Sequence, residues 1–361
     1  MRPVRVVLVA GARPNFMKAA PILRAMRASE RLDPQLVHTG QHYGAAMSDA
    51  FFADLEMPEP NVSLGVGSGT HAEQTARVMV EFERYLTEEP ADIVAVIGDV
   101  NSTLGCAVVA AKFGVRVAHI EAGLRSFDRS MPEEINRIVA DSLATILFTT
   151  STDADEHLRR EGHALDEIHF VGNTMIDSLE HHRADTADGA PLRALGIEPG
   201  AYLLVTLHRP ANVDVPSRLE STLSALADAP LPVVFPMHPR TRAVADRAGM
   251  SDLLARMQII PPAGYLAFLR LQAHARLVLT DSGGIQEETT VLGVPCLTFR
   301  ENTERPVTIS HGTNRLIGTD PARIGHEVRA ALERPLPPKR VPPLWDGHAS
   351  QRIVDVLERA G

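Results

Sequence analysis

The chain opens with the pattern of a strand, a turn and a helix. Val4–Ala10 is apolar without a helical period, Gly11-Ala12-Arg13-Pro14 interrupts it, and apolar residues then recur at helical spacing. This order repeats through the first half of the chain and predicts strands at Leu36–Thr39, Asp92–Ile97, Val115–Ile120 and Ile146–Thr149, and helices at Glu73–Thr87, Ser102–Phe113 and Glu133–Ala144. Apolar strands that alternate with helices are typical of a parallel sheet covered on both faces.

The same order starts again in the second half of the chain. The polar segment His181–Pro199, which Gly and Pro interrupt, separates the two halves and has the composition of a linker. We therefore expect an α/β fold with two doubly wound domains that face each other across a cleft. The strands predicted for the second domain are Tyr202–Leu207, Val233–Met237, Gln258–Ile260, Leu277–Thr280 and Cys296–Phe299.

The expected domain boundaries follow from these segments. Residues 1–180 form the N-terminal domain and residues 200–334 the C-terminal domain. Residues 335–361 begin with the proline-rich sequence PLPPKRVPP, which predicts an extended strap, and end with a helix at Ala349–Ala360. A strap of this length can carry the last helix back to the N-terminal domain.

The composition is that of a folded globular protein and excludes several classes of partner. Of the 361 residues, 44% are apolar and 22% are charged, so the chain can bury a full core. The formal net charge of −9, without a basic block, argues against nucleic acid or an anionic membrane as the main partner. Cys106 and Cys296 each lie in an apolar stretch, which predicts buried free thiols. No apolar run is long enough for a signal peptide or a membrane span, so we expect a cytoplasmic protein.

Acidic residues end two of the predicted strands and open one of the predicted helices. Asp99 and Glu121 follow successive strands, and Glu133 comes directly after a proline at a helix start. Ligands of open α/β sheets bind outside the carboxyl ends of the strands, so we expect the three carboxylates to converge on one crevice. Isolated acids at such positions often cap helices, but three converging acids favour proton transfer. His208, which follows the first strand of the second domain, is a candidate acid or leaving-group partner.

A glycine turn in the second domain suits a phosphate. Ser282-Gly283-Gly284 precedes a helix, so backbone N–H groups and the helix N-terminus can approach an anion. Alone, such a sequence is more often a tight turn with a capping serine. Arg305 further along, and Arg13 in the other domain, raise the expectation of a diphosphate. The chain has no G-x-x-x-x-G-K-S/T sequence and no G-x-G-x-x-G after its first strand, which excludes a P-loop NTPase and the usual dinucleotide fingerprint.

Two further residues are candidates for contacts with a nucleoside. Glu288 lies inside the helix after the glycine turn, where a carboxylate can accept hydrogen bonds from both ribose hydroxyls. The alternative is an exposed helix charge, a role that we expect for its neighbour Glu287 rather than for Glu288. Phe268 can stack near a uracil base, although a phenylalanine on a helix face is more often part of the core.

A series of segments, spread over about the whole chain, carries a family resemblance. They are GARPNFMKAAPIL at 11–23, TGQH at 39–42, GDVNST at 98–103, HIEAGLRSFDRSMPEEINR at 119–137, GNTMIDSL at 172–179, VTLHRPAN at 205–212, DSGGIQEE at 281–288, and TERP with GTNRLIG at 303–306 and 312–318. Together they resemble the UDP-N-acetylglucosamine 2-epimerase family. The resemblance implies the family's fold, two Rossmann-like domains arranged as in the GT-B-type glycosyltransferases.

The resemblance also implies a role for each matching position. Asp99, Glu121 and Glu133 match the acids that handle the sugar protons, and Arg137 matches a site arginine. A homodimer that binds a UDP-sugar without a metal or a cofactor is implied as well. The positions that match the UDP-binding residues are Arg13, Lys18, His208, Phe268, Ser282, Gly283, Gly284, Glu288 and Arg305.

The expected reaction is the interconversion of UDP-N-acetylglucosamine and UDP-N-acetylmannosamine by inversion at C2. That carbon has no adjacent carbonyl, so without a nicotinamide to form a ketone the anomeric C–O bond must break first. Loss of the C2 proton then gives a 2-acetamidoglucal and UDP. Re-addition, with a proton on the other face, gives the epimer.

Other functions stay open at this point. A hydrolysing epimerase would release free N-acetylmannosamine and UDP, and a close variant would act on a modified UDP-sugar such as a 2,3-diacetamido sugar. A GT-B glycosyltransferase would leave three carboxylates underused. A UDP-sugar-binding regulator would not need them at all, and the fold by itself does not choose among these functions.

Overall fold

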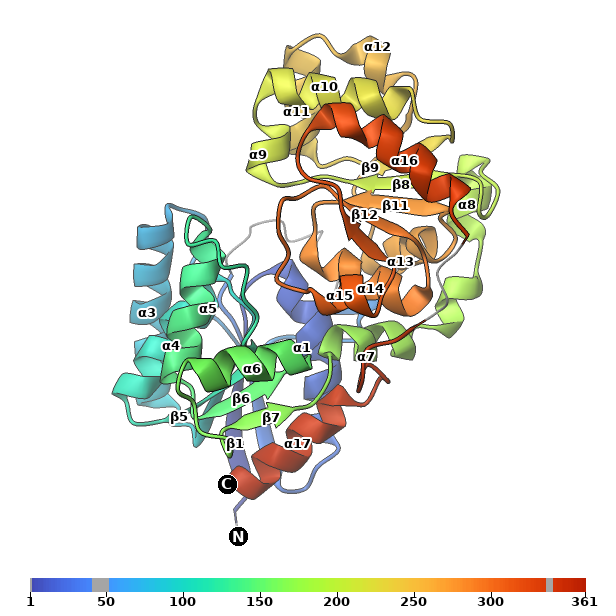
Figure 1. Ribbon diagram of the computed structural model, residues 1–361. Coiled ribbons are helices and arrows are strands. Elements are labelled where there is room, and N and C mark those ends of the chain that lie inside the picture. The colour runs from blue at the N-terminus through green and yellow to red at the C-terminus, as the bar shows by residue number, and fades with distance from the viewer. Residues whose placement is uncertain (1, 41–51, 336–339) are drawn as a thin grey trace. The chain divides into compact units, whose positions relative to one another are not determined.

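The computed structural model describes residues 2–40, 52–335 and 340–361, apart from the side chains of Arg13 and Pro191. The chain divides into two compact units. The first comprises Met1–His181 and Pro343–Gly361, and the second comprises His182–Pro342. Each unit contains one parallel sheet with helices packed against it (Figure 1).

The sheet of the first unit has seven parallel strands in the order β3-β2-β1-β4-β5-β6-β7. The strand order reverses between β1 and β4, which makes their carboxyl ends the expected place for a ligand. The central strands are apolar because helices cover both of their faces. The strands are β1 Val4–Ala10, β2 Leu32–His38, β3 Val62–Ser63, β4 Ile93–Ile97, β5 Arg116–Ala122, β6 Ile146–Thr149 and β7 Ile168–Phe170.

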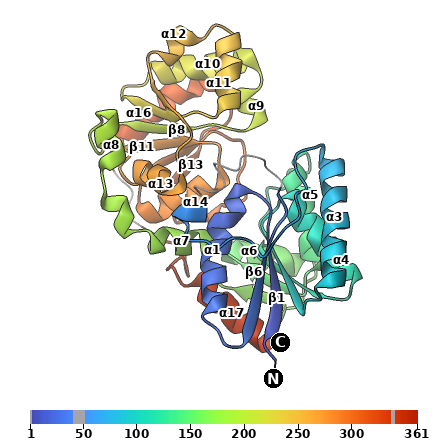
Figure 2. The same cartoon turned by 180° about the vertical axis from the view of Figure 1, so that it is seen from behind.

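Helices cover both faces of this first sheet (Figures 1 and 2). The helices α3, α4 and α5 pack in sequence on one face, whereas α1, α7 and α17 pack together on the other. Phe16 and Leu23 of α1 and Leu357 of α17 are among the buried side chains of the second layer. The helices are α1 Arg13–Arg27, α3 His71–Glu88, α4 Asn101–Lys112, α5 Pro132–Leu143, α6 Thr152–Arg160, α7 Thr174–His181 and α17 Ala349–Ala360.

Directed hydrogen bonds hold the C-terminal segment on the first unit. The buried carboxylate of Asp177 accepts from the backbone N–H groups of Ala349 at 3.1 Å and Ser350 at 2.6 Å, at the start of α17. A carboxylate at a helix N-terminus satisfies free N–H groups and interacts well with the helix dipole. The indole Nε1 of Trp345 donates to the carbonyl of Thr150 at 2.8 Å. The last helix therefore completes the layer that α1 and α7 begin.

The sheet of the second unit has six parallel strands in the order β10-β9-β8-β11-β12-β13. Its strand order reverses between β8 and β11, so this unit has a second switch point. The strands are β8 Leu203–Thr206, β9 Val233–Pro236, β10 Gln258–Ile260, β11 Leu277–Thr280, β12 Cys296–Thr298 and β13 Asn314–Leu316.

Two apolar clusters lie on the two faces of this second sheet. The larger contains Leu223 of α10, Val244 of α11 and Val328 of α16, and the other contains Leu271 of α13 and Ile285 of α14. The helices of this unit are η1 Ala184–Ala187, α8 Ala190–Leu195, α9 Pro210–Val213, α10 Pro216–Ala227, α11 Pro239–Arg247, α12 Ser251–Leu254, α13 Tyr265–Ala273, α14 Gly283–Leu292, α15 Val307–Ser310, η2 Pro321–Arg323 and α16 Ile324–Glu333.

The α/β class with parallel sheets, expected from the sequence, is confirmed. Three short edge strands, β3, β7 and β13, were not predicted. The segment His181–Pro199, whose composition suggested a linker, begins at the division between the two units. It contains α8, and Leu192 of that helix is 1% exposed within the smaller apolar cluster of the second unit. A few apolar side chains are enough to fold this polar segment onto the sheet.

The two cysteines match the prediction, since both Cys106 and Cys296 are buried and free. Burial raises the pKa of the Cys296 thiol to about 11, so this thiol is protonated and unreactive near neutral pH. Within residues 2–40, 52–335 and 340–361, no helix is both long and apolar enough to cross a bilayer.

Candidate active site

Three polar side chains gather around Gly98, directly after β4. Gly98 has a φ of 67°, and a Cβ added there would lie 3.2 Å from Oε2 of Glu121, 3.6 Å from Nδ2 of Asn15 and 3.7 Å from Nζ of Lys18. Glycine therefore satisfies both the backbone conformation and the lack of space. Lys18 and Glu121 are buried and form an ion pair. The structure thus brings two of the predicted site residues together at the switch point of the first sheet.

Glu121 has an unusual backbone conformation. Its φ of 68° lies in the left-handed region, which residues with a Cβ rarely adopt. The register between β5 and β6 shifts between Ile120 and Ala122, so an irregularity of the strand coincides with this residue. Bulges and strained residues occur often at functional sites, where they re-aim a side chain. Here the carboxylate reaches the ammonium group of Lys18.

Asp99 faces Arg137 at the end of β4. Arg137 donates from Nε and Nη2 to Oδ2 of Asp99, at 3.0 and 2.9 Å, and its Nη1 pairs with Glu134. Glu134 is buried and also accepts from the backbone N–H groups of Ser126 and Phe127, both at 2.9 Å. Glu134 therefore orients Arg137, and Arg137 orients Asp99. Glu134 was not predicted from the sequence, although its place in the first turn of α5 was a usable signal.

Glu133 is half-buried in the first turn of α5. Its side chain has no hydrogen bond or ion pair with any residue in the described ranges. It precedes Arg137 by one helical turn, so the two side chains lie on the same face of α5. Because Arg137 bonds to Asp99, that face of α5 is next to the end of β4. The structure therefore brings Glu133 to the region that contains Asp99.

A buried charged network supports the same strand ends, and the sequence analysis did not identify it. His119 of β5 is fully buried, with Nδ1 2.6 Å from Oδ1 of Asp141 and Nε2 2.8 Å from the carbonyl oxygen of Gly98. Both partners are acceptors, so both ring nitrogens face groups to which they can donate. Arg125 also lies 2.6 Å from Asp141. Burial by itself raises the pKa of Asp141, but the contacts with His119 and Arg125 outweigh it and hold the pKa below its usual value.

In the second unit, His208 follows β8 and lies beside the end of β11. Its side chain is 56% exposed, and its Nδ1 lies 2.9 Å from Oδ1 of the fully buried Asp281. Asp281 also accepts from the backbone N–H groups of His208 and Arg209 and from Nδ2 of Asn212. Burial by itself raises the pKa of Asp281, but the contacts with His208, Asn212 and Arg209 hold it below its usual value. The carboxylate is therefore ionised at the switch point of the second sheet.

The glycine turn lies at the start of α14, next to Arg305. Ser282 is the N-cap residue, but its side chain makes no capping hydrogen bond, so the capping role that the sequence left open is not observed. A Cβ added to Gly283 would lie 2.6 Å from Nη1 of Arg305, so the guanidinium occupies the space that a side chain at this position would need. Gly284 is the second residue of the helix. Helical N–H groups and a guanidinium therefore lie together, as an anion site requires.

The prediction that Glu287 is an exposed helix charge is wrong. Its side chain is fully buried and lies 2.7 Å from Nε of Arg305. Arg305 also lies 3.4 Å from Glu304, which accepts two hydrogen bonds from Arg300, at 2.9 and 2.7 Å. The helix α14 is buried from Ile285 to Val291, so its charged positions face protein and need a counter-charge.

Glu288 is buried, and Nε2 of Gln272 donates to its Oε2 at 2.6 Å. Its Oε1 is buried without a well-aligned hydrogen bond. Burial raises the pKa of Glu288 to about 7, and repulsion from Glu287 adds to this effect. Phe268 is half-buried on α13 and packs against the smaller apolar cluster, so the structure supports its core role and leaves one part of the ring accessible.

Some predicted residues fall outside the part of the chain that the structure describes. Arg13 begins α1, but its side chain is not described, and neither are Gln41 and His42 of the TGQH segment. Among the described residues, no group of three or more His, Cys, Asp or Glu side chains is arranged to hold a metal ion. The candidate groups of the first unit are Lys18, Asp99, Glu121, Glu133 and Arg137, and those of the second are His208, Phe268, Ser282, Gly283, Gly284, Glu288 and Arg305.

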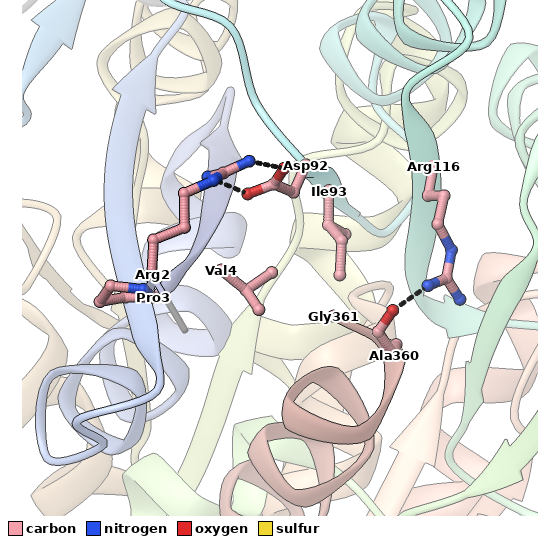
Figure 3. A pocket seen from close by; sticks show the side chains of 8 residues that line it. All are labelled: Arg2, Pro3, Val4, Asp92, Ile93, Arg116, Ala360 and Gly361. Carbon is pink, nitrogen blue, oxygen red and sulfur yellow. Dashed lines mark hydrogen bonds and ion pairs between the residues drawn. The ribbon is translucent and has the colours of Figure 1, made fainter.

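A pocket of about 530 Å³ lies at the opposite end of the first sheet (Figure 3). The amino ends of β1, β4 and β5 line it with Val4, Ile93 and Arg116. Arg2 donates two hydrogen bonds to Asp92 there, at 2.8 and 2.6 Å. The pocket therefore lies away from the carboxyl ends of the strands, where the acids gather, and its charged lining is already paired.

Two parallel sheets of Rossmann-like order, with carboxylates at the strand ends of one and a glycine turn beside an arginine in the other, define the class of α/β proteins that includes the nucleotide-sugar enzymes. The chain belongs to the UDP-N-acetylglucosamine 2-epimerase family, whose model matches residues 24–358. The resemblance seen in the sequence is thereby confirmed.

Individual relatives match over nearly their whole length. The chain is 39% identical over 364 residues to a UDP-N-acetylglucosamine 2-epimerase of Methanocaldococcus jannaschii, covering 98% of this chain and 99% of the relative. It is 40% identical over 364 residues to a UDP-2,3-diacetamido-2,3-dideoxy-D-glucuronate 2-epimerase of Pseudomonas aeruginosa. This match covers 99% of this chain and 100% of the relative. The structure also aligns with the crystal structure of the Methanocaldococcus jannaschii UDP-GlcNAc 2-epimerase in complex with UDP-GlcNAc and UDP. The TM-score is 0.90 at 38% identity, and the alignment covers 99% of this chain and 100% of that chain.

A more distant structure shares the fold alone. The glycotransferase of kitacinnamycin aligns with a TM-score of 0.59 at 14% identity over all of both chains. The GT-B-like, Rossmann-like class that the sequence predicted is therefore confirmed, while an activity cannot be carried over at this identity.

Proposed function

We propose that the protein interconverts UDP-N-acetylglucosamine and UDP-N-acetylmannosamine by inverting C2 of the sugar. The observation that carries this proposal is the placement of three carboxylates, Asp99, Glu121 and Glu133, at neighbouring strand ends and at the start of α5. Neither binding of a UDP-sugar nor transfer of its sugar requires three acids. Membership of the family, and the relative whose structure holds UDP-GlcNAc and UDP, support the same substrate.

The chemistry of this inversion needs acids and an anion site together. The hydrogen on C2 becomes acidic only when the bond between C1 and the diphosphate oxygen breaks and the ring gains oxocarbenium character. One carboxylate then takes the C2 proton, UDP leaves with the electron pair of the C1–O bond, and a 2-acetamidoglucal remains. A second acid returns a proton to the opposite face of C2 while UDP adds again at C1.

We assign the diphosphate to the start of α14. The turn Ser282-Gly283-Gly284 offers backbone N–H groups, Arg305 offers a guanidinium, and Arg13 is proposed to add a second positive charge. Lys18 is paired with Glu121, so an anion that attracts Lys18 would weaken this ion pair and make the carboxylate a stronger base. Arg137 holds the carboxylate of Asp99 in one direction by two hydrogen bonds.

We assign the uridine to Glu288 and Phe268. Oε1 of Glu288, which has no well-aligned hydrogen bond, together with Oε2, suits the two adjacent hydroxyls of a ribose, because a carboxylate accepts on both oxygens. The half-buried ring of Phe268 offers a face on which a base can stack. Burial of Glu288 without a counter-charge is unfavourable, and hydroxyl donors from a ligand relieve it.

The affinity for UDP is expected to rise with pH around neutrality. The pKa of Glu288 is raised to about 7, and ribose hydroxyls donate to the ionised carboxylate, so binding selects the deprotonated form. Between pH 6 and pH 8 the affinity should therefore rise about tenfold. Titration calorimetry of UDP at these two values measures the change.

The matched control for this experiment is the variant Glu288→Gln. The phosphate of UDP titrates equally in both experiments, so only the difference between the two proteins reports on Glu288. We expect the variant to bind UDP more weakly and to show a smaller rise in UDP affinity between pH 6 and pH 8 than the wild type. An equal rise in affinity in the wild type and the variant would rule out Glu288 as the ribose acceptor.

A second substrate has nearly equal support from the relatives. The Pseudomonas aeruginosa enzyme that acts on a diacetamido-dideoxy-glucuronate is 40% identical to this chain. Proton NMR of the products separates the possibilities. The proposal predicts that UDP-N-acetylglucosamine gives UDP-N-acetylmannosamine. Release of free N-acetylmannosamine would identify a hydrolysing enzyme, and conversion of only the diacetamido sugar would assign that substrate instead.

A further inference from the structure

The imidazole of His208 has an exposed edge and an anchored edge. We propose that Asp281 is a positioning residue for His208, which holds a proton on Nδ1 and leaves Nε2 as the atom that exchanges a proton with the ligand. The role of this proton in the reaction rests on the proposed function. The tautomer of the imidazole does not depend on it.

The geometry around Asp281 leaves one arrangement of protons. Its Oδ1 accepts from the backbone N–H of His208 at 3.1 Å and lies 2.9 Å from Nδ1 of the same residue. Its Oδ2 accepts from the backbone N–H of Arg209 at 3.0 Å and from Nδ2 of Asn212 at 2.9 Å. An ionised carboxylate can only accept, so Nδ1 must be a donor. In the neutral imidazole Nε2 is then a base, and in the charged imidazole it is an acid.

The pair lies beside the candidate anion site. Thr206, at the end of β8, is the register partner of Thr280, at the end of β11, so the two strands deliver His208 and Asp281 to one place. Ser282, the first residue of the glycine turn, directly follows Asp281. The side chain of His208 is 56% exposed, whereas that of Asp281 is 0% exposed. The edge of the ring that carries Nε2 therefore faces outward.

This placement gives His208 a step in the elimination. When the C1–O bond breaks, its electron pair stays on the oxygen of the β-phosphate. The charged imidazole donates the Nε2 proton to that oxygen and becomes neutral, while one of the carboxylates takes the proton from C2. On re-addition the oxygen forms its bond to C1 and returns its proton to Nε2. Arg209 donates from Nε to the carbonyl oxygen of Asp281 at 3.1 Å, and its Nη2 lies 3.8 Å from Oε1 of Glu304.

The competing role for Asp281 is structural, since it also holds the backbone of the loop after β8. Asn212→Ala is the matched control, because it removes one hydrogen bond to Asp281 and leaves the contact with His208 in place. Asp281→Asn keeps the size of the side chain but presents an N–H donor to Nδ1. The proposal therefore expects this variant to move the proton to Nε2, and expects Asn212→Ala to keep it on Nδ1.

The tautomer can be read without any substrate. Nitrogen-15 NMR of the full-length protein labelled in histidine distinguishes the protonated from the unprotonated ring nitrogen, and His208→Gln identifies the signals. We expect Nδ1 to carry the proton in the wild type above the titration of the ring, and Nε2 to carry it in Asp281→Asn. An unchanged tautomer in Asp281→Asn, or a wild type with the proton on Nε2, would overturn the proposal. Because no turnover is measured, failure of the proposed function would not affect this result.

A double-mutant cycle tests whether Asp281 acts through His208. If it does, Asp281→Asn and His208→Gln each lower epimerisation by about a hundredfold, and the double variant is no slower than His208→Gln alone. A purely structural Asp281 predicts that the two losses multiply, and that Asn212→Ala loses activity in the same way. Multiplying losses, or full activity of His208→Gln, would contradict the catalytic part of the proposal.

Discussion

Replacing Asp99, Glu121 or Glu133 with the matching amide is expected to lower epimerisation by roughly a hundredfold or more in each case, the usual scale for an acid–base group. The amide keeps the size of the side chain but can neither take nor give the C2 proton. Affinity for UDP should change little, because the acids address the sugar rather than the diphosphate. Steady-state kinetics and UDP calorimetry on the same preparations measure both quantities.

Of these three variants, Glu133→Gln gives the clearest test of a role in proton transfer. Glu121 is paired with the buried Lys18 and Asp99 with Arg137, so their replacement also removes an ion pair. Glu133 has no such pair among the described residues, and its change should leave stability almost untouched. If its charge only stabilises the first turn of α5, the variant instead loses about 0.3–1 kcal/mol of stability and keeps its activity. Glu156→Gln, on the exposed surface of α6, is the control that should retain full turnover.

The second large effect is on stability. Asp141→Asn is expected to lower the free energy of unfolding of the first unit by about 3–5 kcal/mol, the usual cost of removing one partner from a buried charge pair. The change leaves the buried imidazole of His119 and the buried guanidinium of Arg125 without their shared carboxylate. It also weakens the hydrogen bond that Oδ2 accepts from the backbone N–H of Gly123 at 3.1 Å. Denaturant unfolding followed by circular dichroism measures the loss.

The same Glu156→Gln variant is the control for this stability effect. Glu156 pairs with Arg159 and Arg160, at 2.9 and 2.8 Å, but its side chain is 39% exposed. Exposed pairs contribute about 0–1 kcal/mol, so the control should unfold almost as the wild type does. Equal stability of Asp141→Asn and Glu156→Gln would show that the buried network does not stabilise the first unit.

Strands buried on both faces could be predicted from the sequence. The structure gives β1, β6 and β11 the bounds that the apolar runs predicted, because mainly apolar strands are stable only where helices cover both faces of a parallel sheet. The edge strands β3, β7 and β13 could not be found in this way, although the equally short edge strand β10, with its two isoleucines, was predicted. They contain two or three residues each, and Ser63, His169 and Arg315 interrupt their apolar pattern. So short a segment shows no period, and its pairing depends on the neighbouring strand.

The candidate site could be predicted only in part. Residues placed directly after strands, such as Asp99 and Glu121, were identifiable because the topology itself carries them to the switch point. Residues whose role depends on packing between elements could not be identified in this way. Glu134, Asp141 and Asp281 belong to this group. The wrong prediction for Glu287 has the same origin, since the sequence of α14 does not reveal that Arg305 packs against it. The homodimer, the absence of a metal or cofactor, the domain boundaries and the cytoplasmic location stay predictions.

The most direct test of the central claim is the isotope found at C2 after epimerisation in deuterium oxide. Elimination gives the C2 proton to one carboxylate, and another acid delivers a proton from the other side of the ring, so the product should carry solvent deuterium at C2. The measurement is proton NMR of UDP-N-acetylglucosamine incubated with the enzyme in deuterium oxide. The account predicts UDP-N-acetylmannosamine with no signal for hydrogen at C2. Epimer that retains its hydrogen at C2, or no epimer at all, would contradict it.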